Sequence, residues 1–159
     1  MKQMRLRRVL RAAVMSVAML TVGAHAAMSD PAPAEASWLA AVRSEVKAQR
    51  WDQAIAQLRA ANATDSAEWH NLLGFAWRKR TPPDLAAAEA HYQKALELEP
   101  KHRQALEYYG ELLLMKNDLS GAEAMLKRLD RACFFGCEEQ RDLKEAIAKF
   151  KAASSAPKK

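Results

Sequence analysis

Apolar side chains recur at intervals of three and four residues along most of the chain beyond residue 37, the spacing of one face of an α-helix. Ala, Leu, Glu, Lys and Arg, the strongest helix formers, dominate these stretches. Apolar and polar residues nowhere alternate with the period of a strand over a useful length. The pattern predicts an all-α fold, with helices over residues 38–48, 51–61, 67–79, 85–98, 103–115, 119–131 and 138–153.

The predicted helices pair off around a motif that occurs twice. Gly74 follows Asn-Leu-Leu and Gly110 follows Glu-Tyr-Tyr, 36 residues later, whereas the Ala-Glu-Ala segments at 88–90 and 122–124 lie 34 residues apart. Two extra residues in the turn at 81–83 explain the difference. A period in this range is typical of stacked supersecondary units, so the sequence predicts a helical repeat array.

The helix-turn-helix period resembles the tetratricopeptide repeat, a 34-residue unit with small or bulky residues at fixed positions and a proline near its end. With Pro100 as that proline, Gly74, Ala88 and Ala95 fall on small positions. The resemblance implies that Gly74 and Gly110 let the two helices of one repeat touch. It implies a tetratricopeptide-type helical superhelix, an α-solenoid, of about three repeats plus a C-terminal capping helix. The domain would span 37–153, with repeats at about 35–66, 67–102 and 103–132, the capping helix at 138–153 and a flexible tail at 154–159.

In repeats of this family, fixed positions of the first helices line a groove that binds peptides or proteins. Those positions mix cations at the first two units, acids on the third and apolar side chains, which suits an extended peptide or a partner helix. The alternative is that the charges form an ordinary solvated face. The candidate partner-binding residues are Arg43, Lys47, Asn71, Phe75, Arg78, Lys79, Glu107, Glu111, Leu114 and Met115.

The first 26 residues have the form of a secretory signal peptide. Five cations and no acid precede a short apolar stretch, and Ala24-His25-Ala26 fits a cleavage site. We expect cleavage near Ala26, a loose linker at 27–36 and a periplasmic or secreted protein with no membrane anchor after cleavage. With the five cations of the leader set aside, 20 basic residues face 19 acidic ones, so nucleic acid is not an expected partner.

Cys133 and Cys137, in the segment Cys-Phe-Phe-Gly-Cys, allow several interpretations. A four-residue separation across a turn permits a structural disulfide, which an oxidising compartment favours. Redox chemistry, metal binding and free or intermolecular thiols are the alternatives; the thioredoxin-type spacing is absent, and two thiols need further ligands to hold a metal. The segment also resembles the C-terminal part of small exported bacterial repeat proteins.

Catalytic motifs are missing from the sequence: no nucleophile signature, glycine-rich phosphate loop or metal-ligand pattern occurs. We therefore expect no enzyme, no cofactor and no metal. The sequence predicts a non-catalytic scaffold that binds a protein or peptide. Two alternatives stay open: a thiol-dependent redox or metal-handling factor using the cysteine pair, and a structural subunit of an envelope assembly complex. The oligomeric state does not follow from the sequence.

Overall fold

The computed structural model describes residues 37–155. The expected signal peptide and linker, and the last four residues of the expected tail, lie outside the described residues. Among these residues there are seven helices and no strand, so the prediction of an all-α helical repeat solenoid is confirmed. In chain order the helices are α1 Ser37–Lys47, α2 Trp51–Ala61, α3 Ala67–Lys79, α4 Leu85–Leu98, α5 Arg103–Met115, α6 Leu119–Ala132 and α7 Glu138–Ser155.

Polar side chains cap the first turns of four helices. Ser66 accepts a hydrogen bond from the amide of Trp69, and Asp84 and Asp118 cap α4 and α6 in the same way, three residues ahead. His102 caps α5 through Nδ1, which accepts from the amide of Ala105. Each cap satisfies a backbone donor that the first turn of a helix leaves unpaired.

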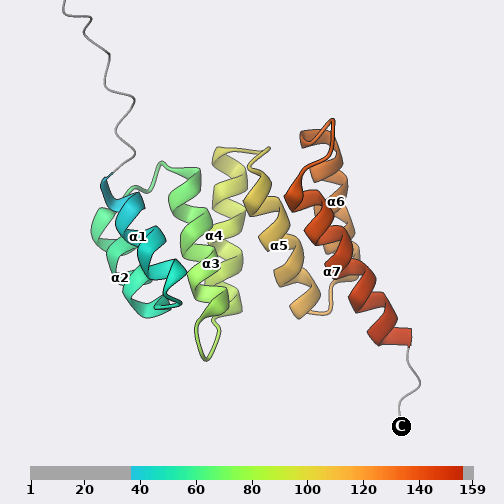
Figure 1. Cartoon of the computed structure of the whole chain (residues 1–159), viewed down its shortest axis with the longest axis horizontal. Helices are drawn as coiled ribbons and strands as arrows, with labels where there is room; N and C mark the ends of the chain where they lie inside the picture. Colours follow the sequence, from blue (N-terminus) through green and yellow to red (C-terminus); the bar gives the residue numbers. More distant parts are fainter. Residues whose placement is uncertain (1–36, 156–159) are drawn as a thin grey trace, which may run out of the picture. The chain divides into compact units, whose positions relative to one another are not determined.

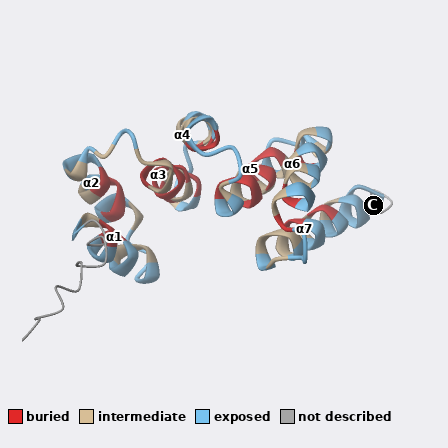
Figure 2. Cartoon of the chain, turned by 90° about the horizontal axis from the view of Figure 1, so that it is seen from above, coloured by how far each residue is buried: buried red, intermediate tan, exposed pale blue. Residues whose placement is uncertain are grey.

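Successive helices pack side by side along the described chain (Figure 1). The pairs α1/α2, α3/α4 and α5/α6 form three helical hairpins, and α7 packs against both α5 and α6. Buried residues lie on the faces where neighbouring helices meet (Figure 2). None of the described helices has the length and apolar character that crossing a bilayer requires.

The core consists of three clusters along this row. One joins α1, α2 and α3, and includes Val42, Leu58 and Leu73. Another joins the end of α4 with α5, α6 and α7, and includes Leu106, Leu129 and Leu143. A small cluster between them is made of Ala88, Tyr92 and Leu112.

The two repeated glycines have different neighbours. A Cβ added at Gly74 would lie 2.8 Å from the ring of Tyr92 and 3.1 Å from the carbonyl oxygen of Ala88, both on α4, the second helix of the same hairpin. At Gly110 the nearest atoms all belong to Leu143 of α7, the closest at 2.6 Å. The expectation that Gly110 makes room for its own hairpin partner is therefore corrected: the space is filled from the capping helix, whose Leu143 is completely buried there.

The last helix is longer than the sequence predicts. It continues through Ser154 and Ser155, which were assigned to the flexible tail. Both hydroxyls donate to backbone carbonyls of the preceding turn, Ser154 to that of Phe150 and Ser155 to that of Lys151. The helix thus continues on local hydrogen bonds past the last buried residue, Ile147.

Candidate functional site

Two adjoining hollows on α1, α3 and α5 share Val46 and Phe75, and together they form what we call the groove. The larger hollow, of about 500 Å³, is lined by Val46, Lys47, Gln49, Trp51, Phe75, Lys79 and Thr81. The smaller, of about 200 Å³, is lined by Arg43, Val46, Glu68, Asn71, Leu72, Phe75, Gln104 and Tyr108. The groove therefore brings together five of the predicted partner-binding residues: Arg43, Lys47, Asn71, Phe75 and Lys79.

Aromatic rings from three helices meet in the groove. Phe75 lies between Trp51 at the start of α2, with ring centroids 5.7 Å apart, and Tyr108 of α5, at 4.7 Å. The ammonium of Lys79 is 5.6 Å from the centroid of the Phe75 ring, a cation–π distance. This part of the groove offers flat apolar contact area next to positive charge.

Arg78 lies beneath these rings and not on the groove surface. Only 6% of the residue is exposed, and its Nη1 pairs with Glu111 at 2.7 Å. Its Nε donates to the hydroxyl of Tyr92 at 3.3 Å, and its guanidinium lies 5.6 and 5.5 Å from the ring centroids of Phe75 and Tyr108. The sequence predicted a cation facing the partner, whereas the structure buries Arg78 against the rings of Phe75 and Tyr108, with Glu111 as its ion-pair partner.

Glu107 is also buried, with 8% of the residue exposed. Burial raises the pKa of its carboxyl to about 8, and the nearby carboxylates of Glu111, Asp142 and Glu139 act in the same direction, while Arg78 opposes them. At neutral pH the side chain is mainly an uncharged acid. Glu107 lines neither hollow, so the structure does not bring it into the groove with the other predicted residues.

Two further predicted residues lie apart from the groove lining. Leu114 is half-buried and packs against the core cluster of α5, α6 and α7, so it belongs to the interior. Met115, at the end of α5, is 52% exposed and lines neither hollow. The helical register placed both residues on the groove side, but Leu114 packs against the core and Met115 reaches solvent at the end of α5.

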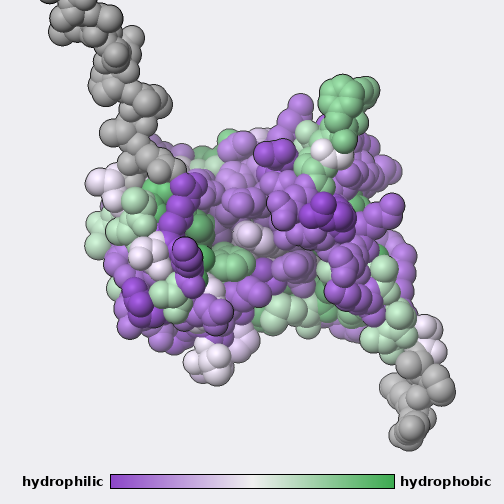
Figure 3. Space-filling view, viewed as in Figure 1, coloured by the Kyte–Doolittle hydropathy of each residue, from purple (hydrophilic) through white to green (hydrophobic). Residues whose placement is uncertain are grey.

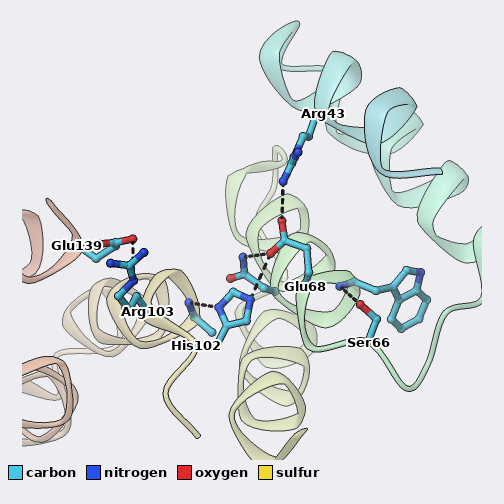
Figure 4. Close-up of polar contacts among 9 residues, drawn as sticks. Arg43, Ser66, Glu68, His102, Arg103 and Glu139 are labelled. Atoms are coloured by element: carbon cyan, nitrogen blue, oxygen red, sulfur yellow. Dashed lines mark hydrogen bonds and ion pairs between the residues drawn. The ribbon is translucent and has the colours of Figure 1, made fainter. Parts of the chain in front are cut away.

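A polar rim borders the smaller hollow (Figure 4). Glu68 is its centre: its carboxylate contacts Arg43 at 3.7 Å and His102 Nε2 at 3.3 Å, and accepts a hydrogen bond from Asn71 at 3.3 Å. Farther along, Arg103 lies 3.7 Å from Glu139 of α7. A partner that binds along this rim would place its own charged groups against these side chains and replace their present contacts.

Asn71 is completely buried although it lines the smaller hollow. Its Nδ2 donates to Glu68, and its Oδ1 has no hydrogen-bond partner among the described residues.

A hollow of about 380 Å³ extends the rim toward α5 and α7. It is lined by Arg43, Glu68, Glu99, Lys101, His102, Arg103, Gln104 and Glu139.

Several lining residues were not among the predicted site residues. Tyr108 and Leu72 occupy the same place in successive repeats, 36 residues apart, and each lies one turn along the helix from a groove position. The helical period could have included them. Trp51 begins α2 and Glu139 belongs to the capping helix α7, so neither lies on a first helix of a repeat, where the groove positions were expected.

The cysteine sulfurs lie 2.09 Å apart, as in a disulfide bond, with α-carbons 5.6 Å apart. A carboxylate oxygen of Glu139 lies within 4.8 Å of both sulfurs. A metal would need thiolates, and in the bonded pair neither sulfur is one. In this state the pair joins the end of α6 to the start of α7.

Comparison with known proteins gives one family and two partial relatives. Residues 84–132, from the cap of α4 through α6, match the tetratricopeptide repeat family. The chain is 30% identical over 95 residues to an E3 SUMO-protein ligase RanBP2 of Drosophila melanogaster, covering 59% of this chain and 4% of that protein. It is 43% identical over 61 residues to a probable biofilm formation methyltransferase WspC of Pseudomonas putida, covering 38% of this chain and 14% of that protein.

These alignments span a small part of each relative's length, so they concern shared repeats and not whole proteins. Tetratricopeptide repeats generally mediate protein–protein interaction and are typically non-catalytic. The match to residues 84–132 and the all-helical solenoid together support a tetratricopeptide-repeat protein.

Proposed function

We propose that this protein is a non-catalytic scaffold that binds a protein or peptide segment in the groove along α1, α3 and α5. The observation that supports this most directly is the set of three aromatic rings centred on Phe75, which lines both hollows. Aromatic side chains supply large apolar contact areas at little cost in conformational entropy, and they are frequent at the centres of protein interfaces.

The chemistry of the lining suggests the kind of segment. Lys47 and Lys79 are exposed beside the larger hollow, and Lys79 lies over the Phe75 ring. A partner segment with an apolar or aromatic side chain for the hollow, and acidic residues for the two lysines, would match both features. The surface in Figure 3 is mostly hydrophilic with smaller apolar patches, in keeping with a polar rim around such contacts.

The same proposal includes an exported location, in a bacterial periplasm or outside the cell. Its support is the leader at residues 1–26, with its cations, apolar stretch and Ala-His-Ala sequence. The bonded cysteine pair fits an oxidising compartment.

Photo-crosslinking in intact bacterial envelopes tests the groove. A crosslinker at Gln49, which lines the larger hollow, should capture a partner in the wild-type chain. The double variant Lys47→Glu/Lys79→Glu should reduce that product by about tenfold or more, because two attractive charges become repulsive. Phe75→Ala should reduce it as well, since it removes the central ring.

The matched control is Lys127→Glu/Lys144→Glu, which makes the same change of charge at exposed positions of α6 and α7 that line neither groove hollow. Thermal unfolding of all variants checks that the fold is kept. If the control and the groove variant lose the product equally, or if neither changes it, the groove is not the binding surface.

A further inference from the structure

Two aromatic side chains project into solvent from the loop between α6 and α7. Phe134 is 89% exposed and Phe135 96%, far more than Leu98 or Met115, the other exposed large apolar residues of the described chain. Their rings meet edge to face, with centroids 5.0 Å apart. The loop forms the apolar projection at the upper right of Figure 3. We call Phe134 and Phe135 the aromatic tip.

The aromatic tip is held away from the core by its connections. Cys133 is buried in the cluster of α5, α6 and α7, and Cys137 packs against the same cluster. The disulfide between them leaves three residues in the loop, and Gly136 closes the turn with a φ of 82° and a hydrogen bond from its amide to the carbonyl of Cys133. With only three residues between the bonded cysteines, the loop holds both rings in solvent. The tip therefore has little conformational freedom to lose when it binds.

An apolar pocket lies on the first hairpin. It has a volume of about 280 Å³ and is lined by Ser37, Trp38, Ala41, Gln57, Ala60 and Ala61, of α1 and α2. On the last hairpin, α7 packs over α5 and α6, but no described helix precedes α1 to cover the first hairpin in the same way. A repeat leaves apolar surface at its edge unless a neighbour covers it.

We propose that the aromatic tip of one copy binds the α1/α2 pocket of a second copy. Phenylalanine rings suit a pocket that offers an indole and three alanine methyl groups and few polar partners. The residues that flank the tip carry both signs, Arg131 and Arg141 against Asp130 and Glu138, so they give no net charge to attract an anionic lipid surface. This self-association is separate from partner binding in the groove, which uses neither surface.

Tip and pocket are different surfaces, so one contact leaves a free tip and a free pocket on the pair, and the proposal is the heterologous arrangement in which these bind further copies. A heterologous contact can continue from copy to copy, whereas a two-fold contact stops at a dimer. Two aromatic side chains bury roughly 150–250 Å² each, well below the roughly 800 Å² per partner of a standard stable interface. The association should therefore be weak and reversible, as for the smallest specific interfaces.

Sedimentation velocity over a concentration series tests this with protein recovered from an exporting host, its disulfide intact. Wild type should form oligomers that grow with concentration. A tip variant, Phe134→Ser/Phe135→Ser, and a pocket variant, Ala41→Glu/Ala60→Glu, should each weaken self-association at least tenfold. The control variant, Ala90→Glu/Ala148→Glu, adds the same charges at exposed positions of α4 and α7 and should behave as wild type.

Mixing the two defective variants gives the sharpest result. The tip variant keeps an intact pocket and the pocket variant an intact tip, so the mixture should form a one-to-one dimer that does not grow further. A monomeric wild type, or a mixture that stays monomeric, overturns the proposal. Loss of association in the tip variant alone would indicate a tip-to-tip contact instead. Flotation of monomeric wild type, but not the tip variant, with phosphatidylglycerol vesicles would indicate a lipid surface.

Discussion

Glu107 has the most strongly perturbed carboxyl group next to the groove. Because its folded-state pKa is raised to about 8, the folded protein holds a proton there that the unfolded chain releases near its ordinary value of 4.5. The neutral form therefore contributes its full stability below pH 4.5, and that contribution is lost as the pH rises through about 8. Burial is the largest cause of the raised pKa, and the neighbouring carboxylate of Glu111 is the next.

Glu107→Gln should remove this dependence, because the amide occupies a similar volume and does not ionise. The free energy of unfolding of the variant relative to wild type should rise between pH 5 and pH 9, by about 2–4 kcal/mol for a buried group with this shift. Urea unfolding at pH 5, 7 and 9 measures it. Asp65→Asn, at an exposed loop position, is the control and should show no such trend.

Comparing wild type with Glu107→Gln at each pH cancels the pH dependence of stability that two histidines add, which has the opposite sign. Burial lowers the pKa of His70, and that of His91 to about 4; their Nδ1 atoms lie 3.0 Å apart. The unfolded chain binds more protons at these histidines between about pH 4 and 6.5, so their contribution to stability is present above pH 6.5 and lost toward pH 4. If the difference between wild type and Glu107→Gln stays constant with pH, Glu107 is ionised in the folded protein.

Residue type and helical register predict the side of a helix that a residue faces, but not its depth. Lys47, Phe75 and Lys79 lie where the repeat positions put them. Arg78 lies on the predicted helix face as well, yet the rings of Phe75 and Tyr108 and the hydroxyl of Tyr92 surround it. One of these side chains lies on α3 itself, but the two tyrosines come from α4 and α5, and the spacing along one helix does not contain that information.

At the scale of helices, the glycines show that equal register does not mean equal contacts. Gly74 is closed in by a ring and a backbone oxygen of its hairpin partner, and Gly110 by the end of the Leu143 side chain. A backbone atom cannot move without shifting a helix, whereas the terminal carbons of a leucine can rotate. The two positions should therefore respond differently to the same substitution.

Gly74→Ala should destabilise the protein by about 1–3 kcal/mol, the usual cost of adding a methyl group to a tightly packed site. Gly110→Ala should cost less, because Leu143 can adjust and alanine gains about 1 kcal/mol over glycine in a helix interior. Urea unfolding of both variants measures the difference. Equal losses would mean that α7 is held as rigidly against α5 as α4 is against α3.

The helix boundaries are the part of the fold that the sequence predicts best. Their caps and breakers are local: Asp84 and Asp118 are visible as capping residues, and Asn62 ends α2 in the left-handed conformation, with φ of 48°. The end of α7 is less predictable, since no breaker stands before Pro157.

At the scale of the described solenoid, two larger core clusters are joined by a small one. Tyr92 is the central member: it is completely buried, its ring fills the space beside Gly74, and it packs near Tyr108 and Tyr109 of α5. The repeat pattern predicts stacked hairpins but not this division, because the division depends on which large side chains meet between hairpins. In a repeat array each unit is stabilised mainly by its neighbours, so a thin contact between clusters limits how cooperatively they unfold.

Tyr92→Ala should therefore separate the two ends of the solenoid. The cavity should cost about 3–5 kcal/mol, as for other large aromatic-to-alanine changes in a core. The loss should fall mainly on α1, α2 and α3, because α5, α6 and α7 keep their own larger cluster and the disulfide. Hydrogen exchange followed by mass spectrometry should show faster exchange in residues 37–79 than in residues 103–150, two regions that wild type protects more evenly.

Phe150→Ala, at the far end on α7, serves as the control, since it removes a ring without touching the small cluster. Uniform loss of protection across all seven helices after Tyr92→Ala would instead show that the solenoid unfolds as one unit despite its divided core.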